Sequence, residues 1–227
     1  MSGGLFITFE GTECSGKSTQ IKILAEKLKN SGFDPVCIRE PGGTPIGEEI
    51  RYILKHSKNG FGMTPETELL LMNASRAQIV REVIRPALAE KKIVICDRFY
   101  DSSVAYQGFG RGLNLDDVYK IIDFAVGDTR PHLTILLDLP LEVSLKRKQI
   151  RDSQVNPEKT NQQNKLLDRF EQSDISFFKR VHEGFRFIAT KEPDRIKIID
   201  ANREIEIIAK EVWEIVFPLV KKVYGNC

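Results

Sequence analysis

The chain has 227 residues and a formal net charge of +2, with acidic and basic residues interspersed. The sequence contains no long basic block of the kind that would indicate a surface for binding nucleic acid or a membrane. We expect no signal peptide, because no charged start precedes an apolar stretch, and the longest apolar runs are too short to cross a bilayer. The four cysteines are scattered without metal-ligand spacing, which predicts a reducing, cytoplasmic setting. A hydrophobic fraction of 41% supports one core, and we expect a single domain, 1–227.

Short β-branched runs alternate with helical patterns along the chain. Taken in order, the expected strands are 5–10, 35–39, 92–96, 133–139 and 195–199, and the expected helices are 18–29, 45–55, 65–90, 115–126, 142–150, 168–190 and 204–223. The strands lack regular polar alternation, as parallel strands covered on both faces do. The order predicts an α/β fold, a doubly wound five-stranded parallel sheet flanked by helices. Cys37 and Cys96 are expected to be buried in strands, and Pro218 is expected to bend or end the last helix.

The most informative motif is G-T-E-C-S-G-K-S at 11–18, between the first expected strand and the first expected helix. It is a P-loop pattern, in which glycines allow a tight turn and backbone N–H groups face an anion. Lys17 is suited to reach the β- and γ-phosphates of a nucleotide, and Ser18 is suited to bind Mg²⁺. The motif indicates a fold of the P-loop NTPase and kinase type. The expected ATP-binding residues are Gly11, Thr12, Glu13, Cys14, Ser15, Gly16, Lys17, Ser18 and Thr19.

A charged pair, Asp97 and Arg98, follows the third expected strand and opens the run D-R-F-Y-D-S-S-V-A-Y-Q-G at 97–108. Such a pair is costly to bury unless it is paired or binds a ligand. Asp97 is suited to hold Mg²⁺ together with Ser18, and Arg98 is suited to bind a second phosphate. Another turn motif, R-E-P-G-G-T at 39–44, follows the second expected strand. Since ligands of such sheets lie at the carboxyl ends of the strands, all three motifs are expected to meet there.

These motifs, in this order and spacing, resemble those of the thymidylate kinase family, whose members phosphorylate dTMP to dTDP with ATP in dTTP synthesis. The resemblance extends through L-M-N-A-S-R-A-Q at 71–78 and through residues 167–187, so it covers nearly the whole chain. The P-loop alone is shared by a superfamily, whereas the other two motifs together are much more specific. The resemblance implies MgATP as phosphoryl donor, dTMP as acceptor, and a homodimer.

The resemblance also assigns roles at the acceptor site. Arg76 and Arg98 match the two arginines that hold the dTMP phosphate, and Arg51 matches a further arginine near it. Glu13 matches the acid that accepts a hydrogen bond from the 3′-hydroxyl of the sugar.

The thymine base is expected to meet three further side chains. Ser103 and Gln107 match residues that hydrogen-bond its edge, and an amide both donates and accepts, as reading a pyrimidine requires. Met72 stands where many members have a Phe that stacks on the base, and a thioether packs there more loosely. The full expected acceptor set is Glu13, Glu40, Arg51, Met72, Arg76, Arg98, Ser103 and Gln107.

Cys14 occupies the P-loop position where one branch of the family carries a catalytic arginine. The other branch supplies this arginine from a lid, and phosphoryl transfer gains about 10³–10⁵ in rate from such a group. We therefore expect a mobile lid at about 146–166, with the arginine supplied by Arg147 or Arg151, which are four residues apart. The expected catalytic cations are Lys17, Arg98, Arg147 and Arg151.

Alternatives remain at this stage. The arginines at 51 and 76 would also suit surface ion pairs, Met72 would suit a core position, and the charges at 146–151 would suit a solvated helix face. At the level of function, one alternative is a P-loop kinase of another nucleoside monophosphate or of a nucleoside. The other is a non-catalytic P-loop regulator, against which the complete loop and acceptor set argue.

Overall fold

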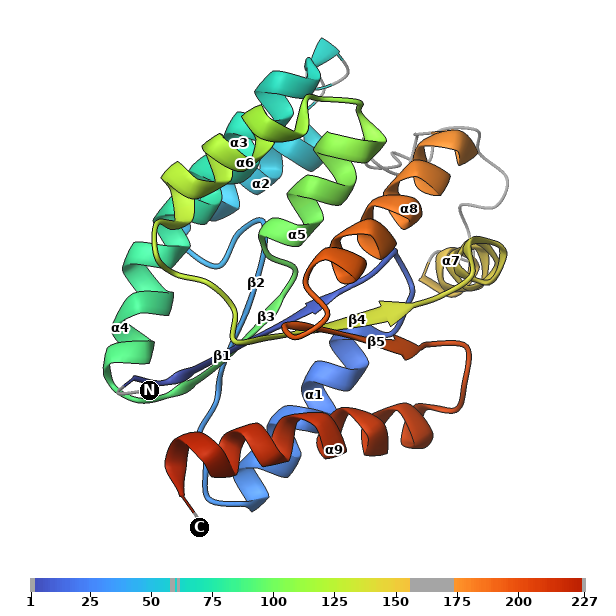
Figure 1. Cartoon of the computed structure of the whole chain (residues 1–227). Coiled ribbons are helices and arrows are strands. Elements are labelled where there is room, and N and C mark those ends of the chain that lie inside the picture. The colour runs from blue at the N-terminus through green and yellow to red at the C-terminus, as the bar shows by residue number, and fades with distance from the viewer. Residues whose placement is uncertain (1–2, 58–59, 61, 156–173, 226–227) are drawn as a thin grey trace.

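A computed structural model describes residues 3–57, 60, 62–155 and 174–225, and it confirms the five-stranded parallel sheet (Figure 1). The strands are β1 (Leu5–Glu10), β2 (Val36–Arg39), β3 (Ile93–Asp97), β4 (Leu133–Asp138) and β5 (Ile196–Asp200). Their order is β2-β3-β1-β4-β5, and every neighbouring pair is parallel. The carboxyl ends of β1 and β3 are therefore adjacent, with Phe9 in register with Asp97. This places the P-loop beside the turn that follows β3.

Helices cover both faces of the sheet, and Figure 1 shows α1 and α9 on one face and α3, α5, α6 and α8 on the other. The helical segments are α1 (Lys17–Asn30), α2 (Pro45–His56), α3 (Pro65–Ile79), η2 (Val80–Ile84), α4 (Arg85–Ala89), α5 (Tyr100–Ser103), η3 (Val104–Gly110), α6 (Leu115–Val126), α7 (Leu141–Val155), α8 (Ile175–Lys191) and α9 (Ile205–Tyr224). Alternate residues of β1 serve the two faces. Leu5, Ile7 and Phe9 pack in the α1–α9 core, whereas Phe6 packs in the core under α3 to α8.

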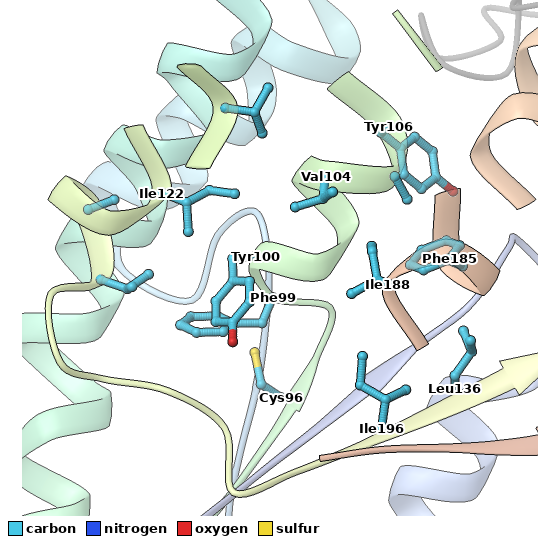
Figure 2. Packing of buried hydrophobic residues seen from close by; sticks show 14 of the residues in the cluster. Cys96, Phe99, Tyr100, Val104, Tyr106, Ile122, Leu136, Phe185, Ile188 and Ile196 are labelled. Carbon is cyan, nitrogen blue, oxygen red and sulfur yellow. The ribbon is translucent and has the colours of Figure 1, made fainter. Parts of the chain in front are cut away.

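The helix formed by α5 and η3 is held against the sheet by aromatic and aliphatic packing. Figure 2 shows Phe99 and Tyr100 over Cys96, with Tyr106 facing Phe185 from α8. Gly184 allows α8 to come this close, because a Cβ there would lie 3.0 Å from Cα of Ala105 and 2.9 Å from Cγ of Phe109. This packing fixes the helix that carries the expected base-reading residues.

Several local expectations differ from the structure. The helix over 100–110 was not expected, because its short run rich in glycine and serine lacks a clear helical period. Cys96 is buried as expected, but Cys37 is exposed, because β2 is an edge strand whose residues alternate between half-buried and exposed. The last helix continues through Pro218 to Tyr224, so Pro218 does not end it, and the bend expected as the other possibility stays a prediction. Expected helix 168–190 begins at Ile175 in the structure, and its first six positions lie outside the described residues.

The long expected helix 65–90 is one helical path that passes through a π-helical segment, Val80–Ile84, between α3 and α4. Within the described ranges, no helix is long and apolar enough to span a membrane.

Candidate active site

The P-loop lies between β1 and α1, as the motif predicts. Gly11 has φ +135°, and a Cβ at this position would lie 2.5 Å from the backbone oxygen of Leu137. Gly16 precedes α1 in the left-handed region with φ 93°, and no side chain caps this helix end. The first backbone N–H groups of α1 are thus directed at the loop, where they are suited to bind phosphate oxygens.

Lys17 is buried inside the loop. Its Nζ donates to the backbone oxygens of Gly11 and Thr12 at 3.1 and 2.8 Å and to Oγ of Ser15 at 3.4 Å. Burial lowers the pKa of Lys17 to about 8. A phosphate in the loop would supply the negative charge that favours the protonated amine.

Two oxygen ligands stand together at the start of α1. Oγ of Ser18 donates to Oδ2 of Asp97 at 2.8 Å, so the residues expected to bind Mg²⁺ are in contact. In the described part of the chain, no cluster of three or more His, Cys, Asp or Glu side chains forms a metal cage. A hydroxyl and one carboxylate fit Mg²⁺, because this ion takes its other ligands from phosphates and water.

The turn after β3 holds Arg98 in an unusual conformation. Its φ of 71° lies in the left-handed region, which side chains other than glycine seldom adopt. The guanidinium donates to the backbone oxygen of Gly11 at 3.0 Å and to Oγ of Ser102 at 3.2 Å, and it lies over the ring of Tyr106. Arg98 therefore stands directly against the P-loop, where it is suited to bind an acceptor phosphate next to the donor.

Glu10 holds this turn in place, and sequence reasoning missed it. Its Oε1 accepts from the backbone N–H groups of Phe99 and Ser102 at 2.7 and 3.2 Å, and its Oε2 accepts from Oγ of Ser102 at 2.6 Å. The helix beginning at Tyr100 has no side-chain cap of its own at Phe99, so the Glu10 carboxylate caps it from another strand. The signal was present in the sequence, because a carboxylate that ends a fully buried strand needs partners.

The environment of Glu10 is electrostatically unusual. Burial, and secondarily the nearby Asp101, raise the pKa of Glu10 to about 7. Asp101 is itself buried and forms a two-pronged ion pair with Arg195, through NH1 and NH2, each at 2.8 Å. Sequence reasoning missed this pair too, because Arg195 lies far along the chain at the start of β5.

A cavity of about 230 Å³ opens between the P-loop and the helices α2, α3 and α5–η3. Ten of the residues expected from the sequence line it: Glu13, Ser18, Glu40, Arg51, Met72, Arg76, Asp97, Arg98, Ser103 and Gln107. The expected donor and acceptor residues therefore meet in one space. The other residues of the expected ATP site are not among those that line the cavity; they lie in the β1–α1 turn or in the first turn of α1: Gly11, Thr12, Cys14, Ser15, Gly16, Lys17 and Thr19.

Arg76 is almost fully buried in the wall of the cavity, with 2% of its surface exposed. Its guanidinium donates to Oε2 of Glu40 at 2.8 Å, to Asn73 at 2.8 Å, to Oγ of Ser103 at 2.9 Å and to the backbone oxygen of Phe99 at 3.2 Å. These contacts exclude the surface ion pair considered above. They also place Arg76 beside Ser103, a residue expected to meet the base, although the resemblance assigns Arg76 to the dTMP phosphate. The phosphate role of Arg76 stays a prediction.

Gln107 is anchored by a residue that sequence reasoning missed. Its Nε2 donates to Oε1 of Glu68 at 2.6 Å, and Glu68 also pairs with Arg111 at 3.1 Å. Helix α3 carries Glu68, Met72 and Arg76 at four-residue intervals, which places them on one helix face. This spacing is the feature of the sequence that could have identified Glu68 as part of the site.

Arg51 donates to the backbone oxygen of Pro41 at 2.9 Å, which ties α2 to the turn after β2.

The arginines expected in the lid lie on α7, outside the residues that line the cavity. Oγ of Ser144 donates to the backbone oxygen of Glu13 at 2.7 Å, so this helix touches the P-loop. Arg147 and Arg151 are three and seven positions further along α7 and share the face of Ser144. The remainder of the expected lid, 156–166, lies outside the described residues.

Comparisons with known proteins agree with this geometry. The sequence pattern of the family described as thymidylate kinase matches residues 9–212. The thymidylate kinase of Kosmotoga olearia is 47% identical over 208 residues, covering 92% of this chain and 93% of that protein. The thymidylate kinase of Geobacter sulfurreducens is 47% identical over 219 residues, covering 96% and 99%. The crystal structure of thymidylate kinase from Ehrlichia chaffeensis superimposes with a TM-score of 0.73 at 33% identity, covering 95% of this chain and 99% of that one.

Proposed function

The chain belongs to the thymidylate kinase family, and from this premise we propose that it transfers the γ-phosphoryl group of ATP to the phosphate of dTMP, giving dTDP and ADP. One observation carries the proposal: a single cavity brings Ser18 and Glu13 of the P-loop together with Arg98, Ser103 and Gln107 of the acceptor motif. This arrangement supports the proposal, because it would set a donor phosphate next to an acceptor monophosphate. The whole chain is proposed to act as one kinase domain.

The donor side would hold MgATP. The N-terminus of α1 and Lys17 would bind the β- and γ-phosphates, and Ser18 with Asp97 would hold the Mg²⁺, directly or through water. When bound, the ion would neutralise charge on the transferred group. Lys17 must leave the loop oxygens that it now contacts in order to reach a phosphate.

The acceptor side would hold dTMP by both ends. Arg98 and Arg76 would bind the phosphate, while Ser103 and Gln107 would face the base, with Met72 packed on its ring. Oε2 of Glu13 is buried and accepts no hydrogen bond from the described residues, so it is available for the hydroxyl of a sugar. Because a monophosphate oxygen is already anionic near neutral pH, catalysis would consist mainly of alignment and charge neutralisation.

A lid would complete the charge neutralisation that Cys14 cannot supply. The contact between Ser144 and the P-loop fixes the start of α7 beside the phosphate site. From there, Arg147 or Arg151 on the same helix face would reach the γ-phosphate when the lid, at about 146–166, closes and excludes water.

We propose that the enzyme is a homodimer, with α3 and α6 at the interface. These helices pack against each other, and each leaves a large apolar side chain exposed, Leu70 at 55% and Phe124 at 86%. Covering both with the same face of a second copy would remove this apolar surface from water.

The cytoplasmic setting expected from the cysteines stays a prediction.

A coupled assay of ADP release tests the reaction. With MgATP, we expect kcat/KM to be highest for dTMP, to be next highest for dUMP, and to be low for dCMP, dAMP, dGMP and thymidine. Lys17→Ala should lower kcat by at least about 100-fold and so exclude a contaminating kinase. A strong preference for any acceptor other than dTMP or dUMP would support a P-loop kinase of another small acceptor. The absence of any ADP release would support a non-catalytic P-loop regulator.

Single-turnover kinetics test the lid arginines. Because an arginine on the transferred group contributes about 10³–10⁵ in rate, at least one of Arg147→Ala and Arg151→Ala should slow phosphoryl transfer by 100-fold or more, with little change in dTMP affinity. Lys146→Ala, an exposed neighbour on α7, is the matched control. Near wild-type rates in both arginine variants would remove α7 from the mechanism.

Sedimentation equilibrium tests the dimer. Phe124→Glu should shift the protein towards monomer, because the added charge would be desolvated at the interface. Ile207→Glu on α9, where the wild-type side chain is 51% exposed, should leave the association unchanged. A wild-type protein that is monomeric at about 50 μM, or dissociation caused by Ile207→Glu alone, would contradict this interface.

A further inference from the structure

Glu68 is a buried carboxylate that lies behind the cavity wall. It has no exposed surface and is not among the residues that line the cavity, whereas Gln107 is. The two are joined by the 2.6 Å bond between Nε2 of Gln107 and Oε1 of Glu68. Arg111 supplies the countercharge to Glu68, with its Nε at 3.3 and 3.2 Å and its NH2 at 3.1 Å from the carboxylate oxygens.

This bond fixes which way round the amide of Gln107 stands. An ionised carboxylate only accepts hydrogen bonds, so the atom of Gln107 that faces it must be the NH₂ group. Turning the amide over would place its oxygen against a carboxylate oxygen with no hydrogen between them. Gln107 therefore keeps its Oε1 as an acceptor, and its second N–H as a donor, for a ligand in the cavity.

Ser103 is oriented in the same manner. Its Oγ accepts from NH1 of Arg76 at 2.9 Å, and a guanidinium is a donor only. The hydroxyl is thereby favoured as a donor towards the cavity. Where these two side chains line the cavity, Oε1 of Gln107 is thus an acceptor that lies with donor groups of Gln107 and Ser103.

We propose that Glu68 is a positioning residue that selects thymine or uracil over cytosine by fixing the amide of Gln107. This inference rests on the proposed function and deepens it. Thymine and uracil carry a hydrogen on N3 next to carbonyl oxygens, which matches an acceptor flanked by donors. Cytosine carries a lone pair on N3 and an amino group beside it, which is the reverse pattern. With the amide fixed, cytosine sets its N3 lone pair against Oε1 of Gln107.

Glu68→Gln separates this role from a structural one. An amide at position 68 both donates and accepts, so it permits either orientation of Gln107. We expect the ratio of kcat/KM for dTMP to that for dCMP to fall by at least about tenfold, because bidentate base contacts discriminate by about that factor or more. The ratio for dTMP to dUMP should stay within about twofold, because both bases carry the N3 hydrogen.

Each ratio is measured on one protein sample, so it does not depend on the fraction of that sample that is folded. Glu68→Asp, which keeps a carboxylate, should retain most of the dTMP preference. Glu66→Gln, an exposed residue of the same helix, is the matched control and should change neither ratio. If Glu68→Gln does not fold, Glu68→Asp and Arg111→Lys carry the test. Both variants keep a carboxylate at position 68 with a cation at position 111, and both should keep the preference for dTMP over dCMP.

The outcomes are distinct. A wild-type protein without activity on dTMP would contradict the proposed function itself. A wild-type protein active on dTMP, whose Glu68→Gln variant keeps the dTMP to dCMP ratio or loses activity on all three nucleotides in parallel, would overturn only the role of Glu68. Loss of the dTMP preference in Arg111→Lys, where the carboxylate and its countercharge remain, would overturn it as well.

Discussion

The site depends on one buried carboxylate at the junction of its two halves. Glu10 is the last residue of β1, directly before the P-loop, and its three hydrogen bonds hold the turn and helix that follow β3. Arg98 reaches back from that turn to the backbone oxygen of Gly11. These contacts hold the P-loop and the segment that follows β3 together from both sides. Without these contacts the left-handed conformation of Arg98 would not be held. Under the proposed function, the donor and acceptor phosphates would then also lose their alignment.

Polar groups in and behind the cavity wall orient the side chains that face the cavity. Arg76 is fixed by Glu40 and Asn73, and Gln107 is fixed by Glu68. Buried polar groups of this kind are stable only when they are satisfied, and in that state they hold a single geometry. The residues that would touch the nucleotides are thus preorganised by groups that do not line the cavity or that are paired within its wall. Under the proposed function, selectivity and rate would therefore depend in part on residues that do not touch the nucleotides.

The sequence predicted the sheet and its parallel direction, because those features rest on local signals. The acceptor residues were assigned through the family resemblance; the structure brings them to one cavity, and their roles stay predictions. The P-loop spacing and the apolar strands are each readable within about ten residues. The sequence did not predict Glu10, Glu68 or the pair of Asp101 with Arg195, because their roles depend on contacts between segments distant in the chain. The helix over 100–110 was not predicted for the same reason. It is stabilised by packing against α8 more than by the helical preference of its own residues.

The central claim is that Glu10 acts through Arg98, and a double-mutant cycle on kcat/KM for dTMP tests it most directly. Glu10→Gln is measured in the wild-type background and again in Arg98→Ala, with the folded fraction of each variant checked by unfolding. We predict a loss of about tenfold or more in the wild-type background and of about twofold or less without Arg98, a coupling of about 1 kcal/mol. Equal losses in the two backgrounds would show that Glu10 does not position Arg98, and would contradict the account.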